Sequence, residues 1–159
     1  MVILGIDPGF AITGYAFIKT EAPGNKITVL DYGCVKTSAS QSLSDRLFII
    51  YEQITELIKK NKPNKIAIEK IFFARNMKTA MAVSEARGVI SLIAGQHNLP
   101  LIELTPLQVK QSLTGYGQAT KQQIQKMVKM ILKLKEIPRP DDVADALAIA
   151  LTASMTKNF

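Results

Sequence analysis

The chain opens with VILGIDPG at residues 2–9, a short apolar run that stops at one acid and is followed by a turn pair. An apolar run of this length before Pro-Gly indicates a β-strand that ends where the chain reverses. Asp7 is therefore expected at the carboxyl end of a strand. In open α/β sheets that edge is where ligands bind.

Further strands are predicted on both sides of this one. Residues 14–19 and 26–36 alternate like strands and are separated only by the APGN turn at 22–25, so they extend an antiparallel meander. KIAIE at 65–69 is a fourth strand that again ends at an acid, and residues 100–104 are a fifth. Because helical segments precede the last two strands, the first and fourth should lie parallel, side by side.

Helical periodicity accounts for most of the remaining chain, with 70–78 expected as a loop. Ser42 or Ser44 can cap the first helix, and Thr105-Pro106 and Thr120 are further helix starts. The predicted fold is α/β, a mixed five-stranded sheet flanked by helices, in a single domain spanning residues 1–159. The predicted helices cover residues 42–61, 79–98, 105–114, 120–134 and 141–156.

The composition excludes several classes of protein. With 47% hydrophobic and 21% charged residues, the 159-residue chain is globular and has no run long enough to cross a membrane. No basic segment precedes Asp7, so no signal peptide is evident and a cytoplasmic protein is expected. One cysteine, Cys34, and one histidine, His97, exclude an internal disulfide and a histidine-based zinc site.

The charge is concentrated in one segment. Twenty basic and thirteen acidic residues give a net charge of +7, and residues 105–135 contain six lysines and no acid. In residues 136–145 the net charge is negative, because acidic residues outnumber basic ones. This pattern indicates a polyanionic partner and a cation that holds carboxylates together. A solvated lysine face followed by an acidic helix start is the alternative interpretation.

Four carboxylates are placed where the predicted fold could bring them together. Asp7 and Glu69 end neighbouring strands, and Asp142 and Asp145 lie three apart on one face of the last helix. Clustered carboxylates repel one another unless a cation neutralises them, and hard ions such as Mg²⁺ prefer oxygen ligands. Such a site can activate water against a phosphodiester. Taken singly, each acid could instead serve a turn, a strand end or a helix cap, and Asp141 is assigned to capping.

At these residues the sequence resembles the RuvC family of crossover junction endodeoxyribonucleases. The matching motifs occur in the family's order from residue 2 to about 154. They are ILGIDPG at 3–9, TGY at 13–15, IAIE at 66–69, ARG at 86–88, QVKQ at 108–111 and DVADALA at 142–148. The resemblance implies a ribonuclease H-like fold, a homodimer, and Mg²⁺-dependent resolution of Holliday junctions by paired symmetric nicks.

The resemblance also implies roles for individual residues. The family's catalytic, metal-binding acids fall on Asp7, Glu69, Asp142 and Asp145, although some members carry His at the position of Asp142. Two Mg²⁺ ions per active site are expected, with Mn²⁺ as a substitute, and a branch-migration helicase complex of the RuvA and RuvB type is an expected partner. Further matches and neighbouring basic residues give the expected DNA contacts, Phe72, Lys110, Lys121, Arg75, Lys78, Lys126 and Lys129.

The residues themselves support these assignments but leave alternatives open. Lys110 and Lys121 belong to the acid-free segment, which could bind phosphates. Phe72 and Phe73 are adjacent, so one of the two rings should be exposed beside Glu69, where it could stack on bases. The apolar surface of the 79–98 helix could form a dimer contact or be entirely core. Those residues are Ala82, Ala86, Val89, Ile90 and Ile93.

The predicted function is therefore a dimeric junction endonuclease that cuts by in-line attack of water, leaving a 5′-phosphate and a 3′-hydroxyl. Three rivals stay open. One is a ribonuclease H-like nuclease acting on RNA, and the second is a DNA-binding scaffold with a degenerate acidic site. The third is an ATPase of the sugar-kinase or actin type, which would need a second lobe.

Overall fold

The centre of the structure is a twisted sheet of five strands. A computed structural model describes residues 1–21, 26–70 and 77–156. The strand order β3-β2-β1-β4-β5 joins antiparallel pairs on one side of β1 to parallel pairs on the other, so the predicted mixed sheet is confirmed. The strands are β1 (Val2–Asp7), β2 (Ile12–Glu21), β3 (Lys26–Lys36), β4 (Lys65–Glu69) and β5 (Leu101–Leu104).

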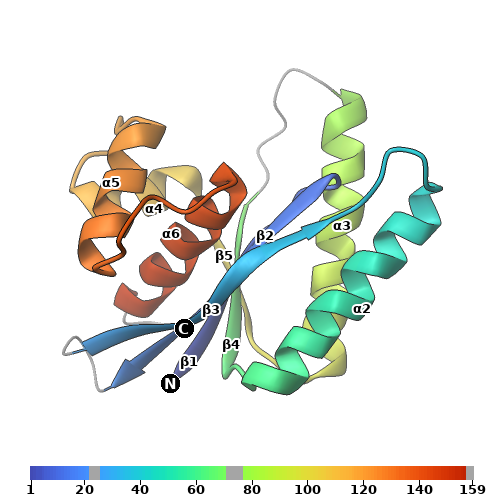
Figure 1. The fold of residues 1–159 in the computed structure, drawn as a ribbon, viewed down its shortest axis with the longest axis horizontal. Coiled ribbons are helices and arrows are strands. Elements are labelled where there is room, and N and C mark those ends of the chain that lie inside the picture. Colours follow the sequence, from blue (N-terminus) through green and yellow to red (C-terminus); the bar gives the residue numbers. More distant parts are fainter. Residues whose placement is uncertain (22–25, 71–76, 157–159) are drawn as a thin grey trace.

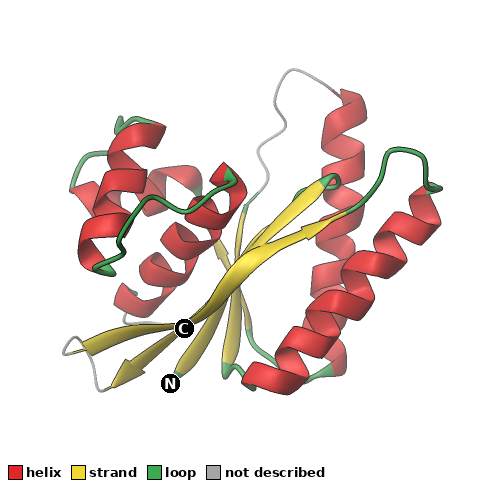
Figure 2. Cartoon of the chain, in the orientation of Figure 1, coloured by secondary structure: helices red, strands yellow, loops and turns green. Residues whose placement is uncertain are grey.

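Helices cover both faces of this sheet. Figures 1 and 2 show α2 and α3 on one side and α4, α5 and α6 on the other. Within the described ranges, none of the helices combines the length and apolar character that crossing a membrane requires. The helices are α2 (Leu43–Asn61), α3 (Met77–Gln96), α4 (Pro106–Thr114), α5 (Lys121–Ile131) and α6 (Asp141–Met155).

Alternation along β1 divides the core between the two faces. Leu4 and Ile6 are fully buried beneath α2 and α3, whereas Ile3 is buried beneath α6. Successive side chains of a strand point to opposite faces, so one strand supplies both cores. β1 is thus fixed from both sides, and Asp7 at its end has a well-defined position.

Helix starts match the sequence prediction better than helix ends. The side chains of Ser42, Thr105 and Thr120 accept hydrogen bonds from the first turns of α2, α4 and α5, which confirms them as N-caps. By contrast, α3 runs from 77 to 96 rather than 79 to 98, and α5 ends three residues early. Both of these helices are followed by a residue in the left-handed conformation, Asn98 and Lys133.

Three of the five apolar α3 residues considered for a dimer contact belong to the core, whereas Ala82 and Val89 are half-buried. Ala86, Ile90 and Ile93 of α3 have no exposed surface, because they pack on the sheet with α2. The solvent-facing side of α3 carries other apolar residues, Met81 and Leu92, which are 63% and 56% exposed.

The helix α6 lies unusually close to the sheet. A Cβ placed on Gly5 would lie 2.3 Å from the carbonyl oxygen of Ala146, and one on Gly14 would lie 2.0 Å from that of Asp142. Only glycine permits such approaches. Since Gly14 pairs with Asp7 across β1 and β2, this contact sets the start of α6 against the end of β1.

Candidate active site

The predicted acids meet at one corner of the fold. β1 and β4 are parallel neighbours with Ile6 opposite Ile68, so Asp7 and Glu69 follow at the same edge of the sheet. The first turns of α6 carry Asp142 and Asp145 to this edge, where the backbone of Asp142 abuts Gly14. Three elements distant in sequence therefore contribute four carboxylates to one site.

The pKa of Asp7 reflects this crowding. Burial, followed by the charges of Asp145, Glu69 and Asp142, raises the pKa of Asp7 to about 7. The pKa of Glu69 is also raised, first by burial and then by Asp145, while the two lysines Lys121 and Lys110 oppose the shift. The carboxylates are thus close enough to disfavour one another's ionisation, as expected of a site whose negative charge is only partly neutralised.

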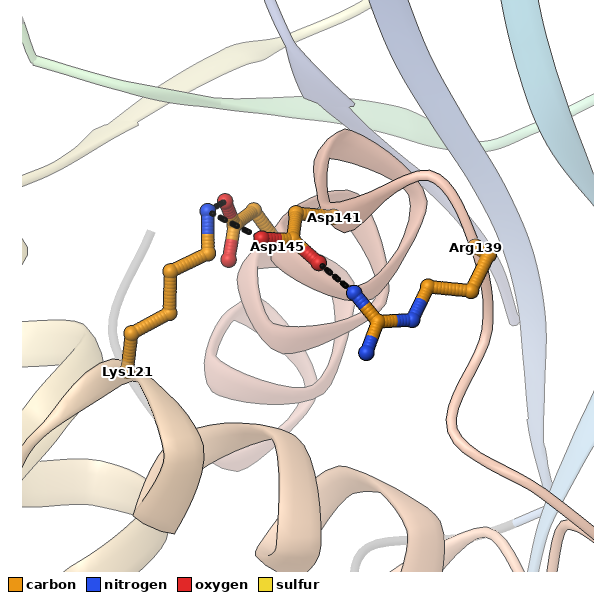
Figure 3. Close-up of polar contacts among 4 residues, drawn as sticks. All are labelled: Lys121, Arg139, Asp141 and Asp145. Carbon is orange, nitrogen blue, oxygen red and sulfur yellow. Dashed lines mark hydrogen bonds and ion pairs between the residues drawn. The ribbon is translucent and has the colours of Figure 1, made fainter.

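One lysine supplies part of the neutralising charge. The Lys121 Nζ lies 2.8 Å from Asp145 Oδ2 and 3.6 Å from Asp141 Oδ2. Figure 3 shows the ammonium reaching from the start of α5 to the two acids of α6. Burial alone would lower the pKa of Lys121, but the hydrogen bond and charge of Asp145, then the charges of Asp141 and Asp7, raise it.

The capping role predicted for Asp141 is wrong. The N-cap position of α6 is Pro140, which makes no side-chain cap, and Asp141 is the first residue of the helix. Its carboxylate instead accepts a hydrogen bond of 2.9 Å from Arg139 and pairs with Lys121. A lysine from another helix can reach Asp141 because the acid is partly exposed on the open side of the site.

The donor set suits a hard divalent ion. Across the described residues, no three acidic, histidine or cysteine side chains already surround a point where a metal ion could sit. The four acids nevertheless offer only oxygen donors, carry an excess of negative charge, and have drawn in an ammonium group. Hard cations such as Mg²⁺ bind this chemistry, with water completing the shell. The residues present therefore fit such an ion once the carboxylates turn toward it.

A hollow of about 220 Å³ opens beside the carboxylates. Glu69 and Asp145 stand on its wall with Lys110 and Lys121, so two of the predicted DNA contacts lie next to the acids. Apolar side chains from α4, α5 and α6 close the rest of the wall: Pro106, Val109, Ile124, Ala148 and Ile149.

The other predicted DNA contacts are not at this hollow. Lys126 lines a separate hollow with Tyr116, because it points about 140° away from Lys121 around α5. Lys129 is half-buried and lines a further hollow with Lys126 and Met130. Lys78 falls in the first turn of α3, and Phe72, with Phe73 and Arg75, lies outside the described residues.

Two residues that hold the turn after Asp7 were not predicted. The Arg46 guanidinium lies 3.5 Å from the Phe10 ring centre, and its Nε donates to Thr37 Oγ1 at 2.8 Å. On the other side of the turn, the buried Thr13 hydroxyl donates to the Gly9 carbonyl at 2.6 Å. Thr13 stood in a family motif, but no pattern in the sequence connects Arg46 with residues 8–11.

Comparison with known proteins assigns the family. The model of the crossover junction endodeoxyribonuclease RuvC family matches residues 3–153. The chain belongs to that family. A RuvC of Ruminiclostridium cellulolyticum is 55% identical over 95% of this chain and 90% of its own length. The RuvC of Alkaliphilus oremlandii is 51% identical over 100% of this chain and 96% of its own length.

Solved structures of RuvC share the fold. The Thermus thermophilus RuvC structure superposes with a TM-score of 0.90 at 38% identity, covering 98% of this chain and 94% of that one. The same protein in complex with Holliday junction substrate gives 0.89 at 35% identity, with the same coverage. A yeast mitochondrial Holliday junction resolvase, which is 18% identical, shares only the fold, with a TM-score of 0.69. The predicted ribonuclease H-like class is confirmed.

Proposed function

We propose that this RuvC family member resolves four-way DNA junctions by cutting two strands symmetrically. The convergence of Asp7, Glu69, Asp142 and Asp145 at the edge of the sheet carries the proposal, because such a carboxylate cluster can hold the divalent ions that activate water against a phosphodiester. Over nearly its full length, the chain aligns with a relative whose structure was solved in complex with a Holliday junction. Family and site chemistry thus lead to the same substrate.

The four carboxylates are the proposed ligands of two Mg²⁺ ions, with Mn²⁺ as a substitute. Ions bound there would supply an activated water and stabilise the leaving oxygen. The protein contributes the arrangement of the acids: β1 and β4 fix Asp7 and Glu69, and α6 adds Asp142 and Asp145. The raised pKa of Asp7 supports this assignment, since positive charge at the site would restore the ionised form.

DNA would approach over the hollow that Lys110 lines. An ammonium group near the acids can hold a phosphate without reading sequence. Lys126 and Lys129 on α5 would extend the contact to a neighbouring stretch of backbone. Phe72, Arg75 and Lys78 follow Glu69 in sequence and are proposed to engage the opened junction.

Two symmetric nicks need two active sites related by a two-fold axis, so the proposed working form is a homodimer. The exposed face of α3 is the proposed contact, because Met81 and Leu92 are mostly exposed there and Gly88 has open space above it. A branch-migration helicase complex of the RuvA and RuvB type is the proposed partner of this dimer on the junction.

Incubation with a synthetic mobile four-way junction, with and without Mg²⁺, tests the function. We expect Mg²⁺-dependent nicks at equivalent positions on two opposite strands, each leaving a 5′-phosphate and a 3′-hydroxyl. Cleavage of structured RNA but not of the junction would contradict the proposal. Junction binding without any turnover would instead identify a scaffold with an inactive site.

A further inference from the structure

We propose that Lys121 is the internal counter-cation of the metal-free site, and that Asp141 is a positioning residue that receives Lys121 when Asp145 binds a divalent ion. This inference rests on the proposed metal-dependent function. It assigns Lys121 a role that precedes any contact with DNA.

The first support is where the ammonium group lies. Lys121 follows the N-cap Thr120, whose hydroxyl and Gln123 form a reciprocal capping box, so the backbone from which the side chain extends is fixed. The ammonium lies 2.8 Å from Asp145 Oδ2, and the charge of Asp7 also helps to raise its pKa. These two interactions, with Asp145 and Asp7, hold the Lys121 ammonium at the acids.

The second support is that Lys121 and a divalent ion compete. Asp145 is one of the proposed metal ligands, and its Oδ2 is the atom that the ammonium occupies. An ion bound to Asp145 would lie close to the ammonium, and two cations held together at a partly buried site repel each other. Metal binding is therefore expected to displace Lys121 from Asp145.

The third support is the orientation of Asp141. Its Oδ1 accepts from Arg139 at 2.9 Å, and its Oδ2 faces Lys121 at 3.6 Å (Figure 3). Arg139 thus holds the carboxylate with one oxygen left for Lys121. A small movement transfers the ammonium from Asp145 to Asp141, which keeps it beside the site and available to a phosphate.

A calorimetric titration of the DNA-free protein with Mn²⁺ tests the role of Lys121. We expect Lys121→Met to bind Mn²⁺ about tenfold more tightly than the wild type, and Lys121→Arg to stay within about threefold of it. Lys59→Met is the matched control, because it makes the same charge change on an exposed position of α2 and should leave the affinity unchanged.

The outcomes separate this inference from the function on which it rests. Unchanged or weaker Mn²⁺ binding by Lys121→Met would overturn the role of Lys121. A wild type without saturable Mn²⁺ binding would overturn the metal-dependent function, and this inference with it. Equal tightening by Lys59→Met would also overturn the inference, because net charge alone would then explain the result.

A double-mutant cycle tests Asp141. We expect Asp141→Asn to weaken Mn²⁺ binding about three- to fivefold in the wild type, because Lys121 is then left with Asp145 alone. In the Lys121→Met background the same substitution should change the affinity less than about twofold. Asp141→Glu should restore wild-type affinity. Equal effects in both backgrounds would show that Asp141 acts on the ion directly, and would overturn the positioning role.

Discussion

At the scale of single residues, Asp7 costs the metal-free protein stability. Its pKa is raised from 3.8 to about 7 by burial and by three neighbouring carboxylates. Between those values the folded state holds a proton that the unfolded state has released. The contribution of Asp7 to stability is therefore fully present below pH 3.8 and is lost as the pH rises to about 7.

The substitution Asp7→Asn removes this penalty and the proposed ligand together. At pH 8 with EDTA we expect the free energy of unfolding to rise by about 1–3 kcal/mol, while junction cleavage is lost and junction binding is kept. Urea unfolding at pH 8 and pH 4 measures the effect, which should shrink at the lower pH. A variant less stable than the wild type at pH 8 would contradict the electrostatic account.

Arg46, which lies on α2, stabilises the turn between β1 and β2. Its guanidinium stacks on Phe10 and donates to Thr37, so Arg46→Ala should lower the free energy of unfolding by about 1–3 kcal/mol. Arg46→Lys should recover only part of the loss, because an ammonium lacks the planar group. Urea unfolding checks both variants, and full recovery by lysine would show that charge alone matters.

The sequence predicts the acids of the site better than its cations. Asp7 and Glu69 can be found because each interrupts an apolar strand at its last residue. The pairing of Lys121 with Asp141 cannot, because it depends on how α5 is placed relative to α6 and on side-chain torsions that no periodicity encodes. Arg46 was missed for the same reason, since 36 positions separate it from Phe10.

At the scale of elements, the position of α6 depends on glycines in the sheet. In Gly14→Ala the new methyl group would overlap the Asp142 carbonyl oxygen, 2.0 Å from its Cβ, and backbone cannot yield as a flexible side chain does. We expect a loss of about 2–4 kcal/mol in unfolding free energy. The variant should also lose junction cleavage, because Asp142 and Asp145 move with the helix.

The matched control is Gly95→Ala in α3. Nothing lies within 4 Å of the position that its Cβ would take, and alanine favours helix over glycine by about 1 kcal/mol. Gly95→Ala should therefore be neutral or stabilising in urea unfolding. If Gly14→Ala were equally well tolerated, the close approach of α6 would not set the geometry of the site.

Element boundaries show where local signals fail. The caps at Thr105 and Thr120 were predictable because a hydroxyl followed three residues later by glutamine marks a helix start. The ends of α3 and α5 were not, since Asn98 and Lys133 take the left-handed conformation without being glycine. Each end is closed by a local backbone hydrogen bond, from Leu99 N–H to the Ala94 carbonyl and from Leu134 N–H to the Lys129 carbonyl, without the glycine that usually marks this motif.

At the scale of the whole molecule, the basic segment forms one lobe. The six lysines of residues 105–135 lie on or beside α4 and α5, on the same face of the sheet as α6 (Figure 1). Lys110→Ala should weaken junction binding and reduce the slope of log K against log salt by about 0.9, whereas Lys59→Ala on the opposite face should change neither. Binding measured across a salt series decides this, and an unchanged slope would remove Lys110 from the DNA contact.

Paired cutting requires that two such lobes act on one junction. Leu92 is 56% exposed on the outer face of α3, the face that is turned away from the sheet core. If α3 pairs with its copy across a two-fold axis, Leu92→Glu places two like charges near each other in an apolar contact. We expect the mass measured by light scattering to fall from dimer to monomer, with each subunit still folded.

The junction assay then reports the consequence for activity. Without the dimer, nicks on the two strands become independent events, so single-nicked junctions should accumulate before any linear duplex products appear. Leu30→Glu on β3 is the matched control, because Leu30 is also exposed, at 44%, but lies on another element. A Leu92→Glu protein that stays dimeric and still nicks in pairs would place the two-fold contact on a surface other than α3.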